Sequence, residues 1–365
     1  MKNKNTKTLK QKSKMIGKGS FGCIYRPEIP CKEDLQKNKK TKKKRSKNKV
    51  SKVMLQSTDT EVNKEFSMDN IIRKIPNHKE WAFIWEKLCD PPSYNKMKKL
   101  SEINKCLKKF KKTKEDYNKS SYMLIGEYGG IPLLDYCLKF FKKTTFRSLK
   151  LFKKSFLRFF RNLEPLFIGL VELSKHNLSH QDLSISNIMY KNKRLYMIDF
   201  GLSCRWNDKK SFKKRSLGQL NSSRIYGPYP YDYIHCFATR NELDTELRSF
   251  QREIYRNNHD DYLRIHRGIF GRNAIHEDIR NDLSKINKNK INVLKNLDTF
   301  SVGILLPTVI CDIADHFKIS NKQIYKCFSQ VDIQNHLSLL KDMTEYNSKN
   351  RISPEESYKR YKSLI

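Results

Sequence analysis

The chain has 365 residues, 38% of them hydrophobic, and carries 75 basic against 38 acidic side chains, a net charge of +37 at pH 7. This length can bury the core of one domain of ordinary size and leaves little for a second. A membrane span and a secretory signal are not expected, because no long apolar run occurs and the basic N-terminus lacks an apolar stretch. Nine cysteines without a C-x-x-C pair indicate free thiols in a reducing compartment rather than disulfides or a zinc site.

A glycine-rich segment follows a basic N-terminal tail of residues 1–14. Residues 16–25 read Ile-Gly-Lys-Gly-Ser-Phe-Gly-Cys-Ile-Tyr and match G-x-G-x-x-G between two apolar runs. Such glycines let a backbone fold closely over phosphate groups, because no side chain obstructs it. A dinucleotide-binding fold would open a helix after the last glycine. The strand-like Cys23-Ile24-Tyr25, which leads to Pro27, favours a β-hairpin instead.

A short strand over Val50–Met54 comes after a lysine-rich interruption near residues 33–49. Many lysines of such a basic chain are ordinary surface residues. Lys52 differs because apolar residues flank it on both sides at strand spacing.

A helix over about Thr60–Lys74 follows and contains two carboxylates, Glu61 and Glu65. Apolar Met68 and Ile72 lie at helical spacing on the face of Glu65.

A longer helical pattern over about Ser148–Lys175 precedes the most polar motif of the chain. Pro165 should kink this helix or begin a new one. Its apolar stripe, which we interpret as core, comprises Leu151, Phe152, Phe156, Phe159, Phe160, Leu163, Leu166, Phe167 and Leu170.

The most informative motif is His-Gln-Asp-Leu-Ser-Ile-Ser-Asn at residues 180–187, followed by Asp199-Phe200-Gly201. The stretch between them predicts two short strands joined by a Lys-Asn-Lys turn, which would bring the two acidic groups together. Phosphoryl transfer needs such groups: Asp182 would orient a hydroxyl and accept its proton, while Asn187 and Asp199 would hold magnesium through oxygen atoms. An H-x-D motif alone could also be a polar turn after a helix.

Together these motifs resemble the eukaryotic-type protein kinase family, over most of residues 15–360. The Gly-Cys-Ile-Tyr-Arg-Pro segment, Cys31 and the Leu-Cys-Asp-Pro segment at 88–91 are similar to serine/threonine kinases of giant nucleocytoplasmic DNA viruses of the mimivirus kind. The resemblance implies an α+β, bilobal kinase-like fold. Its small β-rich N-lobe would span residues 15–127, and its larger helical C-lobe would span residues 128–365 with a helical insertion near 235–290.

The resemblance also implies roles for individual residues. The catalytic residues would be Asp182, Lys52 and Glu65, and the magnesium ligands Asn187 and Asp199. A carboxylate of the 60–74 helix would pair with Lys52, and we prefer Glu65 to Glu61 for this role. The residues that contact ATP would be Ile16, Gly17, Lys18, Gly19, Ser20, Phe21, Gly22, Cys23, Ile24, Lys52 and, at the hinge that binds adenine, Glu127.

Gly126, in the strand before the hinge, has two interpretations. Alignment with the family places it at the gatekeeper position, where no side chain would close the pocket behind adenine. Alternatively, it is a glycine that bends an edge strand.

Two residues near the C-terminus resemble structural positions of the family. Asp298 resembles the acid of a buried helix that steadies the catalytic loop. Arg351 resembles the late arginine that pairs with the acid ending the activation segment, for which Asp232 is our best counterpart. Small-molecule kinases usually lack this arrangement.

The chain also departs from the family. Gln181 replaces the arginine of H-R-D, so loop phosphorylation is not expected as the switch. Ser184 replaces a lysine that helps to neutralise the γ-phosphate, although Asp-Leu-Ser also occurs in RIO-type kinases. The 235–290 insertion carries Leu243, Leu247, Phe250 and Ile254 at near-helical spacing, and either shapes a substrate site or pads the lobe.

The net charge would attract acidic proteins or nucleic acid, with a steep salt dependence. An AT-rich genome would encode the same excess of lysine without a dedicated partner. No nucleic-acid fold signature is present, so nucleic-acid binding would be nonspecific. We expect an intracellular location, in the host cytoplasm or virion, and the basic runs at 2–14 and 37–49 are also compatible with nuclear targeting.

The sequence therefore predicts an ATP- and Mg²⁺-dependent protein kinase. Serine or threonine is the expected acceptor, since the loop lacks the Ala-Ala-Arg or Arg-Ala-Ala pattern of tyrosine kinases. Three alternatives stay open: a pseudokinase scaffold that binds partners through its basic surface, a small-molecule kinase, and a basic packaging protein.

Overall fold

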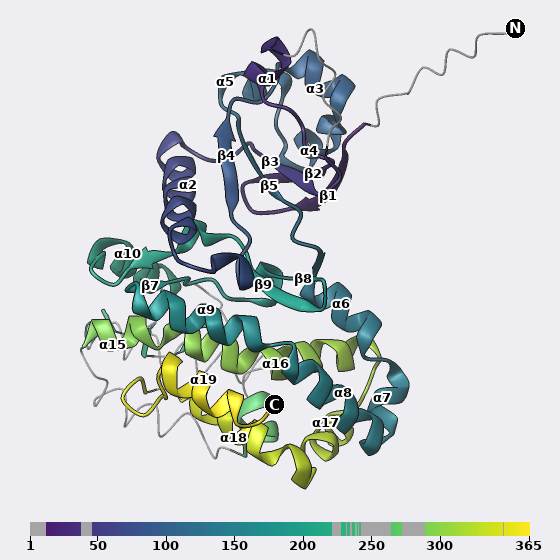
Figure 1. Ribbon diagram of the computed structural model, residues 1–365, viewed down its shortest axis with the longest axis vertical. Helices are drawn as coiled ribbons and strands as arrows, with labels where there is room; N and C mark the ends of the chain where they lie inside the picture. The colour runs from purple at the N-terminus through teal and green to yellow at the C-terminus, as the bar shows by residue number, and fades with distance from the viewer. Residues whose placement is uncertain are drawn as a thin grey trace, which may run out of the picture. The chain divides into compact units, whose positions relative to one another are not determined.

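The protein combines a five-stranded antiparallel sheet with a largely helical region, in a computed structural model (Figure 1). The α+β class predicted from the sequence is confirmed. The described residues are 12–37, 46–220, 228–230, 232–233, 236–237, 239, 241, 264–271, 289–345 and 347–365. The chain divides into two compact units: unit 1 runs to Pro76 and resumes over Phe83–Tyr128, and unit 2 comprises Asn77–Ala82 and Gly129–Ile365.

The sheet of unit 1 has the strand order β1-β2-β3-β5-β4. Its strands are β1 (Lys14–Lys18), β2 (Gly22–Arg26), β3 (Lys49–Met54), β4 (Trp85–Cys89) and β5 (Tyr122–Glu127). β1 and β2 form the β-hairpin that the glycine-rich segment predicts. In β3, Lys52 lies opposite Ile24 of β2 and Leu124 of β5, so it stands on a strand that is paired along both edges.

Short helices accompany this sheet: α1 (Lys32–Lys37), α2 (Asp59–Arg73), α3 (Tyr94–Leu100), α4 (Ile103–Phe110) and α5 (Lys114–Lys119). α2 matches the predicted helix to within a residue at each end. It begins with a capping box, in which the Thr58 side chain accepts from the Glu61 N–H and the Glu61 carboxylate accepts from the Thr58 N–H. Part of the expected basic insertion forms α1, and residues 38–45 lie outside the described residues.

The expectation that all cysteines are free thiols is wrong for unit 1. Cys23 is bonded to Cys106 and Cys31 to Cys89, with Cα–Cα distances of 6.1 and 6.0 Å. Cys23, Cys31 and Cys106 are buried in one apolar core and Cys89 packs against it, so the pairing follows from packing between segments 58 and 83 residues apart. The argument for a reducing compartment, which rested on free thiols, loses its basis.

The helices of unit 2 include α6 (Leu133–Phe140), α7 (Lys143–Arg147), α8 (Leu149–Arg161), α9 (Glu164–Lys175), α10 (Lys209–Leu220), α15 (Lys290–Lys295), α16 (Leu297–His316), α17 (Asn321–Phe328), α18 (Gln334–Met343) and α19 (Pro354–Lys362). Pro165 lies in the first turn of α9, so it begins a new helix, one of the two predicted outcomes. The apolar stripe of α8 and α9 is core with one correction: Leu151 is 46% exposed. α9 packs against both α16 and α19 (Figure 1).

Short strands carry the connections of unit 2: β6 (Ile131–Pro132), β7 (Leu178–Ser179), β8 (Ile188–Lys191), β9 (Arg194–Met197) and β10 (Cys204–Arg205). β8 and β9 are the two predicted strands, and they pair as an antiparallel hairpin. Their two-residue turn places Asn192 and Lys193 at φ 51° and 65°, the left-handed conformation that such a tight hairpin requires.

The segment Lys290–His316 is the one helix among the described residues that is long and apolar enough to cross a membrane by length and composition. Of its most apolar window, 89% is buried inside the protein, as in the core helix of a folded domain. Gly303 permits this packing, because a Cβ there would lie 2.7 Å from the Cβ of Met343 in α18.

The expected helical insertion near 235–290 falls largely outside the described residues, and so do Leu243, Leu247, Phe250 and Ile254. Its described part includes one turn of π-helix over Arg264–Ile269. Arg264 pairs with Asp315 of α16 at 2.8 Å.

The cysteine pairing predicts a thiol count. Alkylation of the denatured, unreduced protein should label five cysteines, which are Cys137, Cys204, Cys236, Cys311 and Cys327, and prior reduction should expose all nine. Mass spectrometry of the alkylated chain measures both numbers. Nine labelled cysteines without reductant would contradict the two disulfides.

Candidate functional site

The candidate residues fall in both units, and each group is described within its own unit. In unit 1, the Lys52 ammonium donates to the Glu65 carboxylate at 2.7 Å, with 5% and 4% of the two side chains exposed. The Glu61 carboxylate is used in the cap of α2. The preference for Glu65 is thus confirmed as a contact. A buried charge pair of this kind persists when its atoms have further hydrogen bonds.

Trp85, which sequence reasoning missed, supplies one of those bonds. Its indole N–H donates to the same Glu65 oxygen that Lys52 contacts, at 3.0 Å. The ammonium lies 5.8 Å from the centre of the indole ring. Trp85 stands at the start of β4 and meets Glu65 of α2 through tertiary packing, so residue spacing in the sequence did not point to it.

The interpretation of Gly126 as a glycine that bends an edge strand is wrong, and its alignment with the gatekeeper position stays a prediction. It lies in β5, opposite Val50 of β3 and Trp85 of β4, so its strand is not an edge. A Cβ at Gly126 would come within 3.0 Å of both the Trp85 ring and the Ile84 carbonyl oxygen. The space beside this glycine is therefore occupied by the indole and the Ile84 backbone, and a side chain here would make these neighbours shift by a few tenths of an ångström.

The glycine-rich hairpin has different constraints at its glycines. A Cβ at Gly22 would lie 2.0 Å from the Val53 carbonyl oxygen, so this glycine is dictated by close approach of β3. Gly19 has open space around it, and its N–H donates to the Gly22 carbonyl at 2.9 Å. The side chain of Cys23 is buried in a disulfide, so that position can offer a ligand its backbone and not a thiol.

In unit 2, the carboxylate of Asp298 holds the loop that carries Asp182. Its two oxygens accept the N–H groups of His180 at 2.6 Å and Gln181 at 3.0 Å. Burial raises the pKa of Asp298 above its ordinary value, while the nearby His180 and the two N–H groups act in the opposite direction. The predicted role of Asp298 as the acid that steadies this loop is matched by these two contacts.

Asp182 and Asn187 are joined by their side chains. The Asn187 amide N–H₂ donates to the Asp182 carbonyl at 2.9 Å and to its carboxylate at 2.8 Å. A 3₁₀ turn over Ile185–Asn187 brings the amide back toward Asp182. The side-chain nitrogen of Asn187 donates both hydrogen bonds. The side-chain oxygen is therefore the atom that Asn187 can offer a cation, and oxygen suits Mg²⁺.

The Asp199 segment lies against the same loop. The N–H of Ile198 donates to the Asn187 carbonyl at 3.0 Å, and His180 Nε2 donates to the Ile198 carbonyl at 3.1 Å. Asp199 itself has a left-handed backbone with φ 64°, and Phe200 packs on the His180 ring at a centroid distance of 4.6 Å. These bonds attach the Asp199 segment to the segment of Asn187, as the β8–β9 hairpin predicts.

Gln181 is fixed by two tyrosines that sequence reasoning did not single out. Its side-chain oxygen accepts from the Tyr233 hydroxyl at 2.7 Å, and its backbone carbonyl accepts from the Tyr229 hydroxyl at 2.5 Å. Its side-chain N–H₂ donates to the Leu202 carbonyl at 3.0 Å. A neutral, buried amide therefore takes the place of the arginine that the family pattern would put here.

Arg351 and Asp232 form the predicted pair. The guanidinium lies 3.0 Å from the Asp232 carboxylate, and both side chains are at most 1% exposed. The second carboxylate oxygen accepts the Ser348 N–H at 2.7 Å, and the guanidinium also donates to the carbonyl of Asn296. The pair links segments 119 residues apart.

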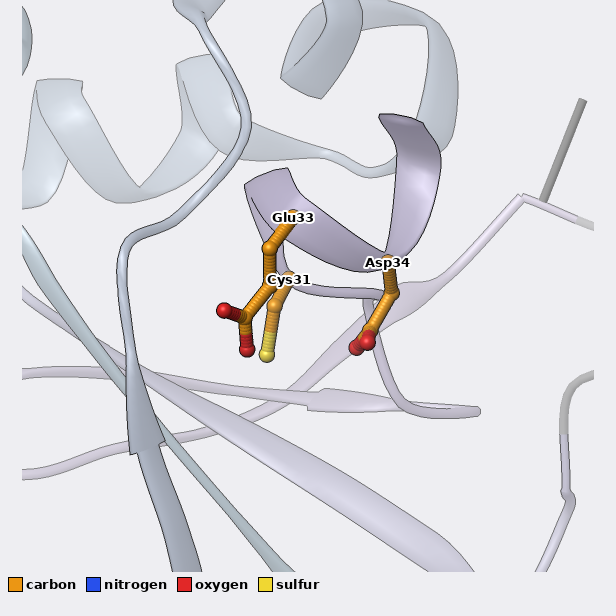
Figure 2. Close-up of side chains that lie close together, drawn as sticks. All are labelled: Cys31, Glu33 and Asp34. Carbon is orange, nitrogen blue, oxygen red and sulfur yellow. The ribbon is translucent and has the colours of Figure 1, made fainter. Parts of the chain in front are cut away.

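A further cluster in unit 1 has the composition of a metal site. Cys31, Glu33 and Asp34 point the same way at the start of α1, with ligand atoms within 4.8 Å of one another (Figure 2). The sulfur is part of the disulfide to Cys89, and Lys87 lies 2.7 Å from Glu33 and 3.2 Å from Asp34. The cluster is therefore an ion-paired surface feature rather than a metal site.

Comparison of the chain with models of known protein families gives no match, and no curated protein matches it. The arguments about function therefore depend on the geometry of the two residue groups.

Replacing Arg351 by Met should lower the free energy of unfolding by about 3–5 kcal/mol, because Asp232 would stay buried without its cation. The matched control is Arg360→Met, which removes a partly exposed pair with Asp342 and should cost about 1 kcal/mol or less. Denaturant unfolding measures both. Equal costs for the two variants would contradict a special role for the buried pair.

Trp85→Phe should lower the free energy of unfolding, because it removes the hydrogen bond from the indole N–H to the Glu65 carboxylate. We expect a coupling energy of about 1–2 kcal/mol between the two positions, measured in a double-mutant cycle of Trp85→Phe with Glu65→Ala. A coupling energy near zero would show that the indole packs beside Glu65 without holding it.

Proposed function

We propose that this protein is an ATP-dependent protein kinase with a bilobal kinase-like fold, in which unit 1 is the N-lobe and unit 2 the C-lobe. The observation that carries the proposal is the loop of unit 2. Asp182 is bonded to Asn187, and the backbone that precedes it is held by the buried Asp298. These hydrogen bonds keep the Asp182 carboxylate and the Asn187 amide at a fixed distance from each other, as phosphoryl transfer requires of its hydroxyl-binding and metal-binding groups.

The nucleotide would be bound by unit 1. Lys52 would contact the α and β phosphates, and Glu65 would keep its ammonium oriented, with the Trp85 indole N–H bonded to the same carboxylate oxygen. The hairpin over residues 16–24 would cover the phosphates with its backbone, and Glu127 would offer main-chain groups to adenine. The fixed, buried state of the Lys52–Glu65 pair supports this role, because an ordinary surface lysine would not be 5% exposed.

The reacting groups would be bound by unit 2. Asp182 would orient the acceptor hydroxyl and take up its proton as the oxygen bonds to the γ-phosphorus and the bond to ADP breaks. Asn187 and Asp199 would hold Mg²⁺, since an amide oxygen and a carboxylate are suitable donors for this hard cation. Bound Mg²⁺ would supply positive charge to the nucleotide phosphates. Serine or threonine residues of proteins, acidic ones favoured by the charge of +37, would be the acceptors.

Two features favour a protein substrate over a small molecule. The Arg351–Asp232 pair ties the segment after α10 to the C-terminal helices, and Asp298 belongs to the long core helix α16. Small-molecule kinases, which share the other motifs, usually lack this arrangement.

The proposal is tested by Mg²⁺-dependent transfer of labelled γ-phosphate to generic serine/threonine proteins and to the chain itself. Asp182→Asn and Asp199→Asn should each lower transfer by about 100-fold or more, because hydroxyl positioning or charge stabilisation is lost. Asp332→Asn, which replaces an exposed carboxylate paired with Lys153, is the control and should keep wild-type activity.

The same preparations should bind ATP in equilibrium dialysis. Wild-type protein that binds ATP but transfers no more phosphate than Asp182→Asn would contradict the kinase proposal and favour a scaffold that has kept the fold.

A further inference from the structure

The loop that carries Asp182 contains no cation of its own. No lysine or arginine occurs between Lys175 and Lys191, in a chain with 75 basic residues, and the Ser184 hydroxyl is bonded to that of Ser186 at 2.7 Å. A phosphoryl group in transfer carries negative charge on its outer oxygens, and fixed positive groups stabilise that charge. If the proposed function holds, Mg²⁺ at Asn187 and Asp199 supplies part of this charge, and any protein cation beside Asp182 has to come from another part of the fold.

A guanidinium from α10 reaches it. Arg215 Nη2 lies 3.9 Å from Asp182 Oδ1, and the two side chains are 22% and 20% exposed. α10 begins at Lys209, ten residues after Asp199, so Arg215 comes from the segment that follows the metal-binding motif and not from the loop itself. The exposed faces of α10 carry further lysines, including Lys213 and Lys214.

Tyr229, which is bonded to the Asp182 loop, fixes the orientation of Arg215. Its Nε donates to the Tyr229 hydroxyl, and the guanidinium lies 5.6 Å from the centre of that ring. The same hydroxyl donates to the Gln181 carbonyl at 2.5 Å, one residue before Asp182. The Nε end of the guanidinium is thereby anchored, and the Nη end is left beside the Asp182 carboxylate.

Electrostatics keep this group charged. Burial acts against the charge, but Tyr229, Tyr233 and Asp182 outweigh it and raise the pKa of Arg215 above its ordinary value. The guanidinium is therefore a permanent cation at this position.

The distance to Asp182 distinguishes two roles. A guanidinium that blocks Asp182 would hydrogen-bond its carboxylate, whereas 3.9 Å is beyond hydrogen-bond distance. A partly exposed ion pair at this separation is weak, too weak to keep a substrate hydroxyl away from Asp182. A cation beside the carboxylate, with N–H groups left to donate, is suited to a phosphoryl group that approaches Asp182.

We propose that Arg215 is a catalytic residue that binds the γ-phosphoryl group during transfer and supplies, from α10, the positive charge that the Asp182 loop lacks. The inference deepens the proposed kinase function and depends on it. The reaction is unchanged: the acceptor oxygen bonds to phosphorus, the bond to ADP breaks, and Asp182 takes the hydroxyl proton.

The test compares phosphoryl transfer by wild type, Arg215→Gln, Arg215→Lys and Lys214→Gln. Arg215→Gln should lower kcat by about 100- to 1,000-fold with little change in the KM for ATP, because the lost interaction forms in the transition state. Arg215→Lys should recover part of the rate. Lys214→Gln removes one charge from the neighbouring, exposed position of the same helix and should leave kcat within about twofold of wild type.

Chemical rescue distinguishes a catalytic role of Arg215 from a merely structural one. Guanidinium ion at tens of millimolar should restore part of the rate of an Arg215→Ala variant, and it should not change the rate of wild type. An absence of rescue together with a lowered melting temperature would overturn the proposal in favour of a structural residue.

The other possible results of the rate comparison also decide whether the proposal for Arg215 stands. Faster transfer by Arg215→Gln than by wild type would overturn the proposal and make Arg215 an inhibitory latch. Equal rates would overturn it while leaving the kinase function intact, since wild-type transfer would still be lost in Asp182→Asn. No transfer by wild type would overturn both.

Discussion

The conformation of the Asp182 loop depends on one buried carboxylate. Asp298 lies in α16, about 118 residues further along the chain, and its two oxygens accept consecutive backbone N–H groups at His180 and Gln181. A carboxylate buried this far from water is stable only with such donors, and the loop N–H groups in turn need an acceptor. The Asp298 carboxylate and the two loop N–H groups therefore satisfy each other's need for a hydrogen-bond partner. The core helix sets the backbone before Asp182, and from there the Asn187 amide and the Ile198 N–H continue the ordering up to Asp199.

The buried acids of this basic chain each serve a defined partner. Glu65 receives Lys52 and the Trp85 indole, and Asp232 receives Arg351 and the Ser348 N–H. In a chain with about twice as many cations as acids, most basic groups are solvated and contribute a general field. The buried charge pairs are the ones that fix side-chain orientation. Away from water an unpaired charge is costly, so each charged side chain is held against its partner.

Two departures from the kinase pattern that the sequence resembles, at positions 181 and 184, lie in a loop that receives a cation from elsewhere in unit 2. Gln181 is neutral, so the tyrosines that bind it can be buried beside it without a further counter-ion. Tyr229 then connects that amide to Arg215, which brings a guanidinium to the loop from α10. The positive charge absent from positions 181 and 184 is thus present in the neighbourhood, supplied by a residue whose place in the sequence gives no hint of it. A sequence motif read position by position would count two losses here, whereas the folded arrangement retains a cation next to Asp182.

The sequence by itself determined the local elements: the glycine hairpin, the strand with Lys52, the helix with Glu65 and the β8–β9 hairpin. Each is encoded by the spacing of neighbouring residues and by turn chemistry. The pairing of Arg351 with Asp232 was also predictable, through resemblance to a known family. The tertiary structure alone decided the disulfides, the indole over Gly126 and the position of Arg215, and it corrected the exposure of Leu151. These depend on side chains that meet across long separations in the chain, and residue spacing carries no information about which distant surfaces will pack together.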